Sequence, residues 1–167
     1  MMHDYQKKRI FALIDPASDP QGAGYNVSQA RIAIGSGQAF GRGLGHGPQS
    51  QLNFIPEKHT DFIFAALAEE MGFVGVLLVM FLFAILIFRG IMIAAKSRDY
   101  LGMYLSTGIV AMLSFHIFLN IGMNLGIAPV AGIPLPLISL GGSSVIVTFI
   151  LLGILESIHI RHKRIDF

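Results

Sequence analysis

Two long stretches of this 167-residue chain carry no charged side chain, and they limit its fold more than any other feature. The first runs from Met71 to Phe88 and the second from Tyr100 to Leu155. A helix needs about 20 apolar residues to cross the hydrocarbon core of a bilayer. Only 13% of the residues are charged, about half of the roughly 25% found in soluble domains. We therefore expect an all-α integral membrane protein.

The second stretch is too long for a single helix. Three prolines and several glycines interrupt it between residues 126 and 142, and proline both removes a backbone donor and restricts the residue before it. We expect three transmembrane helices, at about residues 62–90, 102–125 and 142–160. Residues 62–167 would form this transmembrane region, and residues 1–61 would form a long Gly-rich extracellular loop region before it.

Basic residues gather between the first two spans and after the third. These residues are Arg89, Lys96, Arg98, Arg161, Lys163 and Arg164. Short cytoplasmic segments carry an excess of Lys and Arg, so we expect a cytoplasmic C-terminus and an outer location for the N-terminal loop and residues 126–141. A basic run at residues 7–9 opposes this assignment, but it lies far from any predicted helix end.

Composition excludes several other classes. The chain has no cysteine, which excludes a disulfide scaffold and a thiolate metal site. Its net charge of +2 comes from few charges, so nothing predicts a nucleic-acid partner. The apolar piece from Ile10 to Ile14 is too short for a secretory signal, so something else must deliver the N-terminal segment across the membrane.

Residues 35–47 contain six glycines. The segment lacks the Gly-Lys-Ser/Thr of a phosphate-binding P-loop and the spacing of a dinucleotide fingerprint. Two interpretations stay open. The segment is either a flexible surface loop or a backbone held close to a phosphate or sugar, because glycine lets backbone amides approach a ligand.

Asp61 is the acidic residue whose position suggests chemistry. Either Thr60 or Asp61 could cap the first span. The functional alternative rests on placement at the outer mouth of a membrane helix, beside His59 and below the Gly-rich segment. Glu69 lies roughly 12 Å further along the helix, beyond the about 6.5–9.5 Å of an inverting carboxylate pair. We expect Glu69 and Glu70 to be structural and paired with other helices.

In the second span, His116, Asn120 and Asn124 share one helical face. Polar groups in hydrocarbon must bind another helix or face a water-filled cavity. Both alternatives, interhelical hydrogen bonding and a substrate groove, remain open. Two further short helices offer this face few partners, so we expect the chain to be part of a larger polytopic bundle. The irregular loop at 126–141 also fits a transporter-like re-entrant segment.

Several ordered motifs resemble the SEDS family of bacterial peptidoglycan polymerases, and within it the branch that acts in cell elongation. They lie at residues 32–37, 49–52, 55–64, 69–72, 120–124 and 132–144. Family members are polytopic, and this chain resembles their large fourth extracellular loop and last three spans. Three positions depart from the family pattern: Gln38 stands where Gly is usual, Pro48 where Thr is common and Leu140 where Tyr is common.

The resemblance implies a glycosyltransferase of the bacterial cytoplasmic membrane. It would transfer the glycan of one lipid II to a sugar hydroxyl of another and release undecaprenyl pyrophosphate, with a class B penicillin-binding transpeptidase as partner. The family's essential loop aspartate maps onto Asp61, here expected to be the catalytic general base. No cofactor or metal ligand is assigned, and a requirement for Mg²⁺ or Mn²⁺ stays open.

Further residues are candidates for substrate binding. They are Gln49, Gln51, Lys58, His59, Thr60, Asn120, Asn124 and Ser143, with Arg42 as an additional candidate for the pyrophosphate. Two rival functions remain: a flippase or transporter of lipid-linked precursors, suggested by the broken loop, and a non-catalytic membrane interaction fragment. We expect the 167 residues alone to be inactive.

Overall fold

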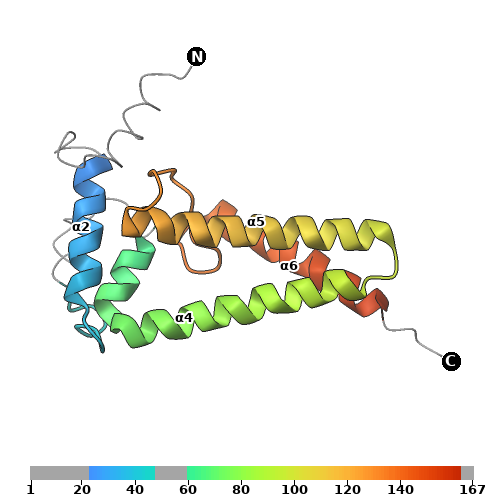
Figure 1. Cartoon of the computed structure of the whole chain (residues 1–167), viewed down its shortest axis with the longest axis horizontal. Helices are drawn as coiled ribbons and strands as arrows, with labels where there is room; N and C mark the ends of the chain where they lie inside the picture. Colours follow the sequence, from blue (N-terminus) through green and yellow to red (C-terminus); the bar gives the residue numbers. More distant parts are fainter. Residues whose placement is uncertain (1–22, 48–59, 163–167) are drawn as a thin grey trace, which may run out of the picture.

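The computed structural model describes residues 23–47 and 60–162, which form four helices and no strand (Figure 1). They are α2 (Ala23–Ser36), α4 (Ile63–Lys96), α5 (Tyr100–Leu125) and α6 (Gly142–His162). Three of them, α4, α5 and α6, are long and apolar enough to cross a membrane. The prediction of an all-α protein with three such helices is confirmed. Gln49, Gln51, Lys58 and His59 lie outside the described residues, as do Pro48, Lys163 and Arg164.

The ends of α4 and α5 follow from local chemistry. Helix α4 continues past residue 90 to Lys96, because nothing breaks it before Ser97, whose backbone is extended. Asp99 is the N-cap of α5, and its carboxylate accepts from the backbone amide of Gly102 at 3.3 Å. At the other end Gly126 takes a left-handed conformation (φ 69°), the usual glycine C-cap.

Helix α2 lies inside the segment that the sequence was expected to leave as a loop. It runs across the ends of α4 and α5 (Figure 1). Its side chains Ala30 and Ala33 are fully buried and pack against Phe62 and Ala65. No helix was predicted from the sequence within the loop region 1–61, so α2 is an element that the sequence did not reveal. Its small buried residues give a weak amphipathic pattern that glycines and polar residues on both sides obscure.

Helix α4 is kinked at Gly72, whose backbone angles (φ 67°, ψ −167°) are not helical. An α-helix would bond the amides of Phe73 and Val74 to the carbonyls of Glu69 and Glu70. Those two bonds are absent. The two amides and the two carbonyls bond to the backbone of the Gly-rich segment instead. The kink thus has an identifiable cause, the insertion of another stretch of backbone into the helical ladder.

We call this arrangement the Gly-rich clasp, meaning residues 37–43 paired with residues 69–74. Its hydrogen bonds run from Arg42 N to Glu69 O (3.0 Å), from Gly43 N to Glu70 O (3.1 Å), from Phe73 N to Gln38 O (2.9 Å) and from Val74 N to Ala39 O (3.0 Å). A Cβ on Gly37 would collide with the carbonyl of Ala68, and one on Gly41 with that of Glu70. These two glycines serve close backbone packing, a role that neither sequence interpretation included.

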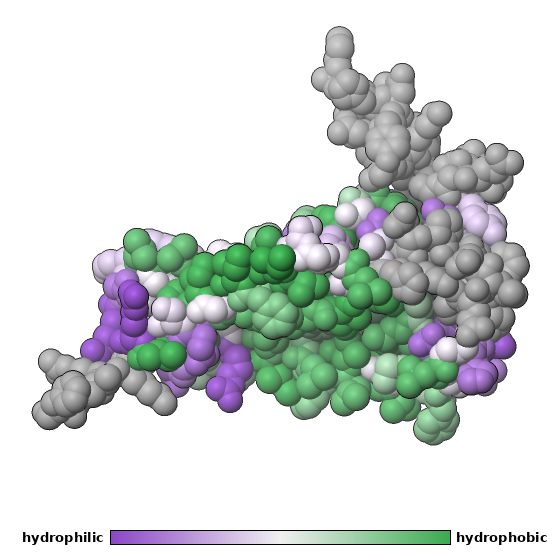
Figure 2. Space-filling model, turned by 180° about the vertical axis from the view of Figure 1, so that it is seen from behind, coloured by the Kyte–Doolittle hydropathy of each residue, from purple (hydrophilic) through white to green (hydrophobic). Residues whose placement is uncertain are grey.

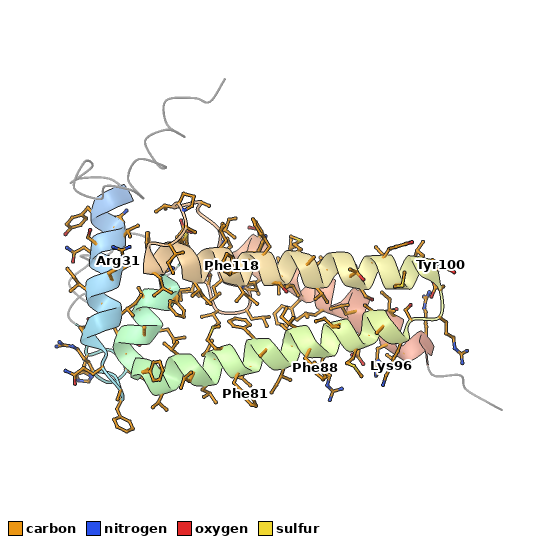
Figure 3. All side chains as sticks on the ribbon, viewed as in Figure 1. Arg31, Phe81, Phe88, Lys96, Tyr100 and Phe118 are labelled. Atoms are coloured by element: carbon orange, nitrogen blue, oxygen red, sulfur yellow. The ribbon has the colours of Figure 1, made fainter. Side chains whose placement is uncertain are left out.

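The outer surface of the helices is apolar (Figure 2). Hydrophobic residues form a broad band, and hydrophilic residues gather at both ends of the molecule. Phe81 and Phe88 are 63% exposed and project from the outer side of α4 (Figure 3). Exposed apolar surface on this scale belongs against lipid or further helices, which agrees with the expectation of a larger polytopic bundle.

Candidate functional site

Asp61 lies just before α4, and its backbone is held by the facing helix α5. The side-chain amide nitrogens of Asn120 and Asn124 lie 3.0 Å and 3.1 Å from the carbonyl oxygen of Asp61. Both asparagines are fully buried. The Asp61 carbonyl is therefore fixed relative to α5 by two side chains that stand one helical turn apart.

Asn124 also caps α4. The N-cap residue Phe62 makes no side-chain hydrogen bond. Instead Oδ1 of Asn124 accepts from the first-turn amide of Ala65 at 3.2 Å, which also donates to the carbonyl of Phe62 at 3.1 Å. The side chain of Asn124 on α5 thus contributes to capping the first turn of α4.

Asn120 continues the network into the loop at 126–141. Its side-chain amide nitrogen donates to the backbone carbonyl of Ile133 at 2.8 Å, and its backbone carbonyl accepts from the side-chain amide of Asn124 at 2.8 Å. These two contacts reach a loop and the same helix, whereas the bond between Ala65 and Asn124 joins α4 to α5, as the interhelical alternative for the polar face expects. Satisfied amides of this kind are what a polar residue inside a membrane protein requires.

Ser139 fixes the residue before Asp61. Its hydroxyl donates to the carbonyl of Thr60 at 2.7 Å and accepts from the amide of Leu135 at 2.8 Å. The side chain is 2% exposed. Two consecutive carbonyls, of Thr60 and Asp61, are thus bound from the loop and from α5, which leaves the Asp61 backbone little freedom.

The Asp61 carboxylate faces the loop at Gly132. A Cβ placed on Gly132 would lie 3.5 Å from Oδ2 of Asp61, and Gly132 has a φ of 67°. Because this residue has no side chain, the loop backbone approaches the carboxylate without covering it. Asp61 itself is half-buried.

Arg31 joins α2 to this region and was not among the predicted residues. Its Nε donates to the carbonyl of Leu125 at 2.9 Å and its Nη2 to that of Gly126 at 3.0 Å. In Figure 3 it lies between α2 and the C-terminal end of α5. A guanidinium on the last carbonyls of a helix stabilises its negative end. The sequence alone could not reveal this role, because the carbonyls that Arg31 contacts lie more than ninety positions further along the chain.

Ser143 and His116 lie in a different hollow. They line a groove of about 190 Å³ between α5, α6 and the prolines at 134 and 136. Asp61 is not part of this lining. The polar face of α5 is therefore divided, with Asn120 and Asn124 toward the start of α4 and His116 toward α6. The guanidinium of Arg42, another candidate, is exposed and donates to the carbonyl of Ser36 at 3.2 Å.

A longer apolar groove of about 530 Å³ runs between α4 and α5. It extends from Ile91 toward Gly122, Leu125 and Ile127, which are near the end of α5 that holds Asp61. Ser114 is the single polar side chain in its lining. Within residues 23–47 and 60–162, no cluster of three or more His, Asp or Glu side chains could hold a metal ion.

The geometry can be compared with known proteins. The family model of the FtsW, RodA and SpoVE cell cycle proteins matches residues 1–164. The chain belongs to this family. It is 52% identical to peptidoglycan glycosyltransferase MrdB of Escherichia coli K12 and 42% identical to peptidoglycan glycosyltransferase RodA of Treponema pallidum, covering 99% and 96% of this chain. The alignments cover 45% and 37% of those two proteins, so the chain spans less than half of their length.

Two solved structures share the fold. One, described as the structural coordination of polymerization and crosslinking by a peptidoglycan synthase complex, matches 98% of this chain and 44% of its own, with a TM-score of 0.79 and 32% identity. The other is a mutant of the rod shape determining protein RodA of Thermus thermophilus. It matches 65% of this chain and 36% of its own, with a TM-score of 0.60 and 37% identity. The predicted family and the all-helical membrane fold are confirmed.

Proposed function

We propose that these residues form the C-terminal part of a peptidoglycan glycosyltransferase that polymerises lipid II during cell elongation, with Asp61 as its general base. Relatives that bear the name peptidoglycan glycosyltransferase support the reaction class. The observation that carries the role of Asp61 is the fixation of its backbone by Asn120 and Asn124. A base needs such a fixed position relative to the proton that it abstracts.

The reaction requires one base and a stabilised leaving group. The acceptor sugar hydroxyl attacks the anomeric carbon of the donor, and its proton passes to the Asp61 carboxylate. The bond from that carbon to the pyrophosphate oxygen breaks, and undecaprenyl pyrophosphate leaves with the electron pair. Because cations or amide dipoles can meet the charge of this leaving group, a second carboxylic acid is unnecessary.

The lipid-linked substrate suits the position of Asp61. This residue precedes the apolar helix α4, at the end of the molecule away from Arg98 and Arg161. By the positive-inside rule that end faces outward from the bacterial cytoplasmic membrane and the C-terminus faces the cytoplasm. The sugar headgroup would meet Asp61 there, and the apolar groove between α4 and α5 would take part of the lipid tail.

The remaining candidates divide into two groups. We assign Asn120 and Asn124 a positioning role, because their amides are bonded to the protein backbone. The proposed substrate contacts are Gln49, Gln51, Lys58, His59, Thr60 and Ser143. A class B penicillin-binding transpeptidase is the proposed partner, since a related structure concerns a synthase complex that coordinates polymerization with crosslinking.

The test uses the complete gene product that contains this chain, purified and supplied with fluorescent lipid II. Asp61→Asn keeps the shape of the side chain and removes its basicity. Polymerisation should fall by about 10²–10⁴-fold, the usual contribution of a general base. The matched control is Glu156→Gln, an exposed carboxylate on α6, which should leave the rate unchanged. Assays with and without EDTA show whether Mg²⁺ or Mn²⁺ is needed.

Two outcomes would contradict the proposal. Normal polymerisation by a folded Asp61→Asn protein would remove the role of Asp61. Transbilayer movement of lipid II in reconstituted vesicles, without any glycan product from the wild-type protein, would favour the flippase alternative. A melting curve of each variant separates loss of chemistry from loss of folding.

A further inference from the structure

A groove with both charged and apolar lining residues lies at the end of the molecule opposite Asp61. It has a volume of about 200 Å³ and opens between the turn at residues 97–99, the start of α5 and the last turns of α6. Lys96 and Tyr100 mark this end in Figure 3, and in Figure 1 the last part of α6 reaches the same end. Because α4 ends, α5 begins and α6 ends here, the groove lies at the boundary of the apolar band.

Two arginines supply the charge of this groove. Arg98 and Arg161 both line it and are both exposed. Within the described ranges, neither guanidinium makes a hydrogen bond or an ion pair. Ser157 adds a hydroxyl to the same lining. Two guanidinium groups with no partner among the described residues match the oxygens of a phosphate group.

Asp99 is the acidic residue of the lining, so the two arginines leave the lining with a net positive charge. Its Oδ2 accepts from the amide of Gly102 at 3.3 Å as the N-cap of α5, where the helix dipole favours a negative group. The hydroxyl of Ser97 donates to the Asp99 carbonyl at 3.2 Å. Gly102 lines the same groove without a side chain. A Cβ at this position would lie 2.6 Å from the side-chain oxygen of Ser97.

The rest of the lining is apolar. Leu101, Leu105, Ile154 and Ile158 come from α5 and α6 and continue toward the membrane-spanning part of both helices. A free phosphate ion gains nothing from such a surface. A phospholipid gains from both parts, because its phosphate can meet the arginines while the start of an acyl chain covers the apolar residues.

We propose that this groove binds an anionic phospholipid, with its phosphate held between Arg98 and Arg161 and the start of an acyl chain against Leu105 and Ile158. The site is separate from the Asp61 region and does not depend on the proposed glycosyl transfer. It binds phosphatidylglycerol in preference to phosphatidylcholine, because a zwitterionic headgroup adds a cation that the two arginines repel.

Native mass spectrometry of the complete gene product tests this site, with phosphatidylglycerol, phosphatidylcholine and inorganic phosphate as the three probes. Each arginine near an anionic lipid surface contributes roughly fivefold in binding. The Arg98→Gln, Arg161→Gln double variant should therefore bind phosphatidylglycerol roughly 25-fold more weakly. The control is Arg89→Gln, an exposed basic residue near the end of α4 that is not in the lining, and it should bind as the wild type does.

Equal binding of phosphatidylglycerol by the wild type and a folded double variant would overturn the proposal. Displacement of phosphatidylglycerol by millimolar inorganic phosphate would also overturn it, since the site would then take a free anion. If the double variant does not fold, crosslinking on the wild type decides. A photoactivatable phosphatidylglycerol should label residues 97–105 or 154–161, and labelling confined to other segments contradicts the site.

Discussion

The side-chain amide of Asn124 donates to the backbone carbonyl of Asp61 at 3.1 Å, across 63 positions of sequence. Its oxygen accepts from the amide of Ala65 at 3.2 Å. One side chain of α5 therefore bonds both to Asp61, which carries the proposed base, and to the first turn of α4, which follows it. The contact holds the Asp61 backbone where no regular helix holds it, because Asp61 lies before the first residue of α4.

The first prediction concerns Asn124→Ala. Loss of the amide frees the Asp61 carbonyl, and a displacement of about 1 Å can cost roughly 10²-fold in rate. We expect kcat for lipid II polymerisation to fall about 10–100-fold with a smaller change in KM. Thr107→Ala on the same helix is the control, since its hydroxyl is exposed and donates to the carbonyl of Met103 in its own helix.

A double-mutant cycle separates positioning from a general loss of structure. If Asn124 acts through Asp61, Asn124→Ala should have little further effect in a protein that already carries Asp61→Asn. Additive losses in the cycle would show that Asn124 works independently of Asp61.

The second prediction compares two buried serines. Ser139 bonds to Thr60 and Leu135, so Ser139→Ala leaves a buried carbonyl and a buried amide without their partner and should cost about 1–3 kcal/mol. Ser106 is also fully buried, but its hydroxyl has no partner among the described residues. Ser106→Ala should leave stability unchanged or raise it by about 1 kcal/mol. Thermal melting in one detergent measures both, and a similar loss in the two variants contradicts the assignment.

The sequence predicts the transmembrane helices well, and the reason is physical. A bilayer imposes length and apolarity on each helix independently of its neighbours, so the charge-free stretches were sufficient for α4, α5 and α6. The polar face of α5 was also predictable from periodicity. Its partners were not, because the pattern that groups Asn120 and Asn124 does not contain the Asp61 carbonyl to which they bind.

The Gly-rich clasp could not be predicted from residue types. Its four hydrogen bonds join backbone groups only, and backbone groups leave no signature in the sequence. The glycines indicated a close approach without identifying what approaches. Here the neighbour is the interrupted turn at Gly72 of α4. Arg31 was missed for a similar reason, because its acceptors are the carbonyls of Leu125 and Gly126.

The third prediction concerns Arg31→Ala. The variant loses two hydrogen bonds to the C-terminal carbonyls of α5 and a favourable charge at the negative helix end, and we expect a loss of about 1 kcal/mol. Hydrogen exchange should accelerate for the amides of Gly126 and Ile127, which close this end. Arg31→Lys keeps the charge without the forked donors. Its stability and its exchange rates should lie between those of the wild type and those of Arg31→Ala. Unchanged exchange in Arg31→Ala would contradict the capping role.

The fourth prediction is a stabilising change. Gln38 has a φ of 49°, in the left-handed region that costs a residue with a side chain roughly 1–2 kcal/mol. Gln38→Gly should raise the stability by a few tenths to about 1 kcal/mol, after the greater chain entropy of glycine is subtracted. A lower melting temperature would mean that the exposed Gln38 side chain makes a contact worth more than the strain.

The fifth prediction tests the clasp at Gly72. Its backbone angles lie in a region essentially restricted to glycine, where another residue costs about 1–3 kcal/mol, and a Cβ would collide with the amide nitrogen of Gly41. Gly72→Ala should therefore destabilise the protein by at least about 2 kcal/mol. Gly108 in α5 has open space around its Cβ position, so Gly108→Ala should be neutral or stabilising by about 0.5–1 kcal/mol.

The two glycine variants make the same chemical change in two membrane helices, so helix propensity alone would affect them alike. A difference in melting temperature between them isolates the clasp. Gly41→Ala removes space from the other side of the same contact, since its Cβ would meet the Glu70 carbonyl, and it should resemble Gly72→Ala. If the melting temperature of Gly72→Ala instead equals that of Gly108→Ala, α4 can straighten without the clasp. Residues 37–43 then do not hold the kink.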